Sequence, residues 1–198
     1  MHVEFIRTGE RSYHALMRRA DGVTVRVPGA GRMLPLPHDI VHFVAERELG
    51  LRGGFWGSVA DGVLFGGMTI VSGRQRPHAA DRSKALMRSN TDLMLQAEVV
   101  VGALDAIVLD GADADPRRAL KRLSEAQSAV RIGAVPLDVS GLQRVCVALR
   151  EAAARWRDLP VGTALTVEWN VRGNGSVRRQ TRDRRRGRQV SRVPAGAA

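Results

Sequence analysis

Hydrophobic and polar residues alternate along the first 28 residues, in the segments HVEFIR, SYHALMRR and VTVRV. Such alternation is typical of strands with one buried face, because successive side chains of a strand point to opposite faces of the sheet. The segments TGER and ADG between them have the residues of tight turns. The pattern predicts a three-stranded antiparallel meander, followed by the Gly/Pro-rich connection PGAGRMLPLP.

The middle of the chain changes to a helical pattern, with apolar residues three and four positions apart. This spacing predicts helices over residues 37–49, 56–65 and 81–109, and further helices that begin near residues 116 and 140. A polar loop is expected over residues 72–80. Alternation returns in VGTALTVEWNV, and the glycines at 173 and 175 can turn this strand into a short hairpin.

These elements predict an α+β fold. Its antiparallel sheet combines the N-terminal meander with one or more C-terminal strands, because a lone strand cannot satisfy its own backbone groups. Three or four helices from the middle of the chain cover the sheet. We expect one globular domain over residues 1–172 and an Arg-rich, disordered tail over residues 173–198.

The net charge of +11 is concentrated in this tail, since residues 172–192 hold nine Arg and one Asp. No aromatic residues are interleaved with the arginines, so the tail cannot read a base sequence, but it can bind the phosphates of nucleic acid or an acidic partner. A tail that only keeps the protein in solution is the alternative. The partner-binding candidates are Arg178, Arg179, Arg182, Arg184, Arg185, Arg186 and Arg188.

Cys146 is the only cysteine, which excludes an intrachain disulfide and a cysteine-based zinc site within one chain. The N-terminus lacks the apolar core of a signal peptide, and no segment approaches the roughly 18 apolar residues of a membrane span. We therefore expect a cytoplasmic protein with no membrane partner.

The segment PHDIVHFVAE, residues 37–46, is the best candidate for a functional site. His38 and His42 are four residues apart, so on a helix their imidazoles project together, as two ligands of zinc or another first-row metal do. Glu46 lies roughly 12 Å along the helix from His38, too far to share one ion with it. A third ligand has to come from elsewhere, and the candidates are His14, Asp61, His78 and Glu98.

The pentapeptide HDIVH resembles the HExxH motif of zinc metallopeptidases, with Asp39 in place of the glutamate that acts as general base. Asp39 is one methylene shorter, so the same reach requires a shifted backbone or metal. The resemblance implies Asp39 as the catalytic base or as a partner of a ligand. Glu46 is the second catalytic candidate, because it can hydrogen-bond His42 and fix its tautomer.

Two interpretations without a metal stay open. His42 with Glu46 or Asp39 can form a general acid/base pair in a pocket. Alternatively, the helix packs through Ile40 and Val44, and its histidines and glutamate face water. The specific hypothesis is a metal-binding, hydrolytic protein with a zinc-like divalent cofactor at His38 and His42. The alternative is a non-enzymatic binding protein whose basic tail contacts nucleic acid or an acidic partner.

The longer segment LPHDIVHFVAERELGLRGGFWG resembles a small family of uncharacterised bacterial proteins. The resemblance covers about a tenth of the chain and implies no particular activity. The residues that carry it are Pro37, His38, Asp39, His42, Phe43, Glu46, Gly50, Gly54, Phe55, Trp56 and Gly57.

Overall fold

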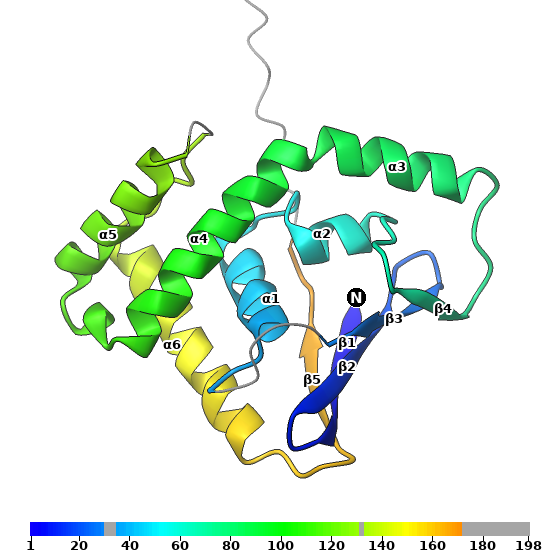
Figure 1. The fold of residues 1–198 in the computed structure, drawn as a ribbon, viewed down its shortest axis with the longest axis horizontal. Helices are drawn as coiled ribbons and strands as arrows, with labels where there is room; N and C mark the ends of the chain where they lie inside the picture. The colour runs from blue at the N-terminus through cyan, green and yellow to red at the C-terminus, as the bar shows by residue number, and fades with distance from the viewer. Residues whose placement is uncertain (30–34, 131–132, 172–198) are drawn as a thin grey trace, which may run out of the picture.

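One antiparallel sheet, with strands in the order β4-β3-β2-β1-β5, forms one side of the molecule (Figure 1). The structure is a computed structural model that describes residues 1–29, 35–130 and 133–171. The strands are β1 (His2–Gly9), β2 (Ser12–Arg18), β3 (Thr24–Pro28), β4 (Thr69–Ser72) and β5 (Ala164–Glu168). The predicted α+β class, with a sheet built from both ends of the domain, is confirmed.

The register of the sheet follows the alternation in the sequence. On β1, Val3 lies opposite Met17 of β2, and Phe5 lies opposite Ala15 of β2 and Leu165 of β5. These residues are buried, whereas polar neighbours along the strands, such as Glu4 and Thr166, are exposed. One face of the sheet therefore packs on the core and the other faces solvent.

The helices lie together on the apolar face of the sheet (Figure 1). α1 is the central one, with α4 and α6 beside it. The bounds are α1 (His38–Leu49), α2 (Phe55–Ala60), α3 (Ala79–Ser89), α4 (Thr91–Leu109), α5 (Pro116–Ser128) and α6 (Val139–Arg157), with a short 3-10 helix η1 (Ala112–Ala114). Gly50 ends α1 in a left-handed conformation with φ 68°, as glycine favours.

Three aromatic rings join the sheet to the first two helices. Phe5 of β1, Phe43 of α1 and Trp56 of α2 contact one another edge to face, with ring centroids 5.3 to 5.7 Å apart. All three side chains are fully buried. Aromatic pairs of this kind contribute about 0.5–1.5 kcal/mol each beyond the burial of their area. They fix α2 and the preceding loop against α1.

The structure corrects two of the predicted helices. The helix expected over 81–109 is two helices, α3 and α4, that meet at Asn90, where the side-chain amide donates to Ser58 Oγ at 3.0 Å. The helix expected over 56–65 ends at Ala60, and Gly62 follows with φ 114°. The short edge strand β4, whose four residues are all exposed, was not predicted.

The expected hairpin turn at residues 173–175 and the basic tail, residues 173–198, lie outside the described residues. Among the helices of the described ranges, none is long and apolar enough to cross a membrane.

Candidate metal centre

The histidine face of α1 packs toward α4. The His42 side chain is 5 % exposed, so the interpretation in which this face is in open water is wrong. Its Nδ1 atom lies 3.1 Å from Glu46 Oε1, on the same helix. Its Nε2 atom lies 3.3 Å from Glu98 Oε2, on α4. His42 therefore sits between two carboxylates.

His38 completes a group of three potential ligands. Its ring contacts that of His42, with centroids 4.7 Å apart and the two planes at 85°. One ligand atom each from His38, His42 and Glu98 lies within 4.8 Å of the other two. Of the four candidates for a third ligand, the structure brings Glu98 to the histidine pair.

The other three candidates lie elsewhere. His14 is on β2, where it pairs with Pro28 of β3 and with Ile6 of β1. The Asp61 carboxylate is 3.6 Å from an Arg52 nitrogen. His78 precedes α3 and is 4.0 Å from the Asp81 carboxylate.

Exposure differs across the cluster. The Glu98 side chain is 58 % exposed and His38 is half-buried, whereas His42 and Glu46 are buried. The cluster is thus anchored in the core on one side and reachable from solvent on the other.

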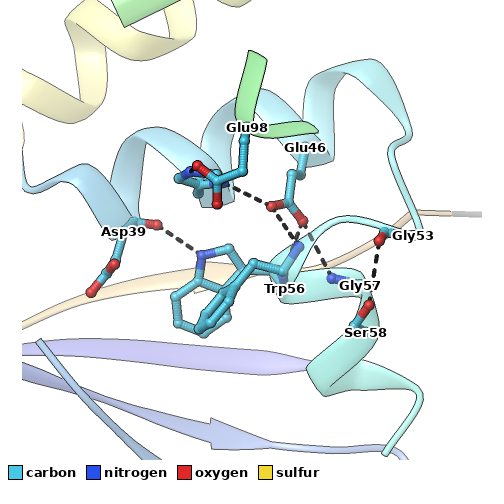
Figure 2. A network of polar contacts seen from close by, with 9 residues as sticks. Asp39, Glu46, Gly53, Trp56, Gly57, Ser58 and Glu98 are labelled. Carbon is cyan, nitrogen blue, oxygen red and sulfur yellow. Dashed lines mark hydrogen bonds and ion pairs between the residues drawn. The ribbon is translucent and has the colours of Figure 1, made fainter. Parts of the chain in front are cut away.

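Glu46 is a fully buried carboxylate that is surrounded by donors (Figure 2). It accepts hydrogen bonds from the backbone N–H groups of Phe55 (2.9 Å), Trp56 (2.9 Å) and Gly57 (3.4 Å), at the start of α2. The fourth donor is Nδ1–H of His42. A protonated carboxyl would place a hydrogen against these donors, so the contacts favour the ionised form.

The electrostatics of His42 follow from this arrangement. Burial acts to lower the pKa of His42, but the hydrogen bonds to Glu46 and Glu98 outweigh burial and raise the pKa to about 9. The pKa of Glu46 is raised, because burial outweighs the hydrogen bonds from His42 and from the backbone, which act in the opposite direction. The hydrogen bond to His42 lowers the pKa of Glu98. The raised pKa of His42 favours the imidazolium form, in which Nδ1 faces Glu46 and Nε2 faces Glu98.

The same contacts determine the tautomer of His42. In neutral His42, the hydrogen bond to Glu46 keeps the single ring proton on Nδ1, so Nε2 is the atom available to a metal. Ligand histidines in metal sites commonly donate their second N–H to a carboxylate in this way. The predicted hydrogen bond between Glu46 and His42 is present.

The glycines of the GGFWG segment allow the backbone to approach Glu46. A Cβ atom on Gly54 would lie 2.5 Å from Glu46 Cδ, and one on Gly57 would lie 2.0 Å from the Arg52 carbonyl oxygen. A Cβ atom on Gly53 would lie 2.4 Å from a Leu93 methyl group on α4. Side chains at these positions would displace the loop that binds Glu46.

Asp39 does not join the cluster. Its carboxylate accepts a hydrogen bond from the Tyr13 hydroxyl at 2.6 Å, and its carbonyl oxygen accepts one from Trp56 Nε1 at 2.8 Å. Figure 2 shows the Asp39 carboxylate turned away from Glu98. Asp39 thus ties the first turn of α1 to β2 and α2, and the geometry gives no support to a role as general base.

Comparison of the chain with protein-family models, with curated proteins and with solved structures found no match.

We expect Gly54→Ala to lower the free energy of unfolding by about 1–3 kcal/mol, because the added methyl overlaps the Glu46 carboxylate. Gly102→Ala is the matched control. Gly102 lies on the exposed side of α4, and a Cβ atom there meets nothing within 4 Å, so this change should leave stability equal or raise it by up to about 1 kcal/mol. Urea denaturation measures both. Equal stabilities of the Gly54→Ala protein and the parent would contradict the packing described here.

The metal-free protein should lose stability as the pH rises from about 6.5 to about 9. The folded pKa of His42 is raised to about 9 from an ordinary value of 6.5, so its stabilising contribution is complete below 6.5 and is lost above that pH as the folded form deprotonates. Urea denaturation in chelator at several pH values measures this slope. The slope should flatten in His42→Gln, and an unchanged slope would contradict the assignment.

Proposed function

We propose that the protein binds a divalent first-row transition metal, of the zinc class, through His38, His42 and Glu98. The observation that carries this proposal is the convergence of two imidazoles of α1 and one carboxylate of α4 within 4.8 Å. Two nitrogen ligands and one oxygen ligand suit zinc, iron or manganese better than calcium or magnesium, which prefer oxygen ligands.

One of the distances in the group already fits such an ion. Two tetrahedral ligands with bonds of about 2.1 Å lie about 3.4 Å apart. His42 Nε2 and Glu98 Oε2, at 3.3 Å, already have this separation. The other separations in the group are at most 4.8 Å, so they have to shorten by up to about 1.4 Å to reach the same tetrahedral spacing. His38 and Glu98 are the more exposed members, so they can move into place by side-chain rotation.

His42 is the fixed member of the group. It is held by Glu46, which is itself held by the backbone of α2. A ligand that is oriented before binding loses little conformational entropy on binding. The supporting hydrogen bond also makes the imidazole a better electron donor to a metal.

A group of three protein ligands leaves a coordination position for water, as in catalytic zinc sites, where the ion lowers the pKa of that water. This supports hydrolysis as the reaction class. The sequence-based candidates for a base, Asp39 and Glu46, are both occupied away from the open side of the cluster. The proposal therefore assigns metal binding to His38, His42 and Glu98, and assigns no base.

Protein purified without a histidine tag should contain near-stoichiometric zinc, iron or manganese by element analysis, or take up one equivalent of zinc after treatment with chelator. Glu98→Gln should weaken zinc binding at least tenfold, about 1.4 kcal/mol, because it removes one charged ligand. His42→Ala should abolish binding, but it also removes the partner of buried Glu46.

The matched control is Asp92→Asn, which removes an exposed carboxylate of the same helix outside the cluster. This variant should bind zinc like the parent protein. A folded parent protein that takes up no zinc, manganese or iron would refute the proposal, as would equal zinc affinities of the Glu98→Gln and parent proteins.

A further inference from the structure

A second polar site lies where the β2–β3 turn, the end of α2 and the start of α3 meet. A cavity of about 310 Å³ opens there, within the size range of small-molecule pockets. None of its lining residues belongs to the His38–His42–Glu98 cluster, so this inference is independent of the proposed metal site. The polar residues of the lining are Arg19, Asp21, Asp61, Gln75, Arg76 and Arg82.

Arg19 is the unusual residue of this cavity, because its side chain is only 4 % exposed. Its Nε and Nη2 atoms donate to the two carboxylate oxygens of Asp21, at 3.1 and 2.6 Å. The buried Nη1 atom has no hydrogen-bond partner among the described residues. This N–H is also closed off from the cavity, so Arg19 serves the cavity by holding the Asp21 carboxylate in its wall.

The charges of the lining leave a positive excess. Asp21 is matched by Arg19, and Asp61 is matched by Arg52, which is not in the lining. Arg76 and Arg82 form no ion pair with a carboxylate within the described part of the chain. The pKa of Asp21 is lowered, first by the hydrogen bond from Arg19 and also by the nearby charge of Arg76. Two unmatched cations suit a ligand with two negative charges.

The start of α3 adds to this preference. Ala79, the first residue of this eleven-residue helix, lines the cavity, and the preceding His78 makes no side-chain hydrogen bond to the first turn. Arg82 lies on the same turn and donates to the Pro77 carbonyl oxygen, which keeps its guanidinium beside the start of the helix. Helix N-termini favour phosphate groups through their N–H groups and the helix dipole.

We propose that this cavity binds a phosphate group, with Arg76, Arg82 and the first turn of α3 as its donors. The cavity is larger than one phosphate needs, and its wall carries the carboxylates of Asp21 and Asp61, which accept hydrogen bonds from hydroxyl groups. The chemistry fits a phosphomonoester of a small polyhydroxy compound, and free phosphate shares the same donors.

Nuclear magnetic resonance titration of the full chain tests this proposal, because each amide reports its own surroundings and the Arg-rich tail is seen separately. The probes are inorganic phosphate, ribose 5-phosphate and ribose, at constant ionic strength. The amides of Ala79 and Ala80 should shift saturably with both phosphates and not with ribose. Tighter binding of ribose 5-phosphate, by tenfold or more, would assign the site to a phosphomonoester, and equal binding would assign it to free phosphate.

The double variant Arg76→Ala/Arg82→Ala removes two exposed side chains, so its fold should be retained while phosphate affinity falls at least tenfold. Arg74→Ala is the matched control, because Arg74 is exposed in the same loop but does not line the cavity. Its affinity should stay within about twofold of the parent value. Shifts confined to the tail, undiminished affinity in the double variant, or an equal loss in Arg74→Ala would each overturn the proposal.

Discussion

The rest of the structure depends on the hydrogen bonds that the buried carboxylate of Glu46 accepts. Its oxygens accept hydrogen bonds from backbone N–H groups at the start of α2 and also from Nδ1–H of His42. Glu46 therefore connects the fold of a loop to the orientation of a candidate ligand. Removing a charged acceptor from water is costly unless its lone pairs are satisfied, and here four donors satisfy them. The loop GGFWG can adopt this position only with glycine at residues 54 and 57. The fold of the loop and the orientation of the histidine thus have one common cause.

This arrangement separates a rigid part of the candidate metal centre from a mobile part. His42 is fixed by Glu46, and α2 is in turn fixed by the rings of Phe5, Phe43 and Trp56. His38 and Glu98 are nearer to solvent and can adjust. A site of this kind combines a preoriented first ligand with ligands that close around an ion. In the metal-free protein His42 lies between Glu46 and Glu98, so in the proposed site a proton and a metal would compete for its Nε2 atom.

The local elements could be predicted from the sequence, whereas the site's long-range contacts could not. Alternation defined β1, β2 and β3, and Gly50 marked the end of α1, because these signals act within a few residues. Asn90 lies between α3 and α4 and contacts Ser58 of α2. A contact with another helix cannot be predicted from the spacing of apolar residues along one helix. Glu98 could be distinguished from His14, Asp61 and His78 as the third candidate ligand only from the packing of α1 against α4. The sequence held one signal that pointed to Glu98. This residue lies in the apolar run QAEVVVGAL, where a carboxylate is unusual. The orientation of Asp39 toward Tyr13 also depends on the sheet.

The central claim is that His38, His42 and Glu98 act as ligands of a single ion, and anomalous diffraction at the zinc edge from crystals of the zinc-loaded protein tests it most directly. The account predicts one strong anomalous peak about 2.0–2.2 Å from a nitrogen of His38, from Nε2 of His42 and from an oxygen of Glu98, with Nδ1 of His42 still hydrogen-bonded to Glu46. A zinc-loaded crystal with no peak at this position, and with His42 Nε2 still paired to Glu98 alone, would contradict it.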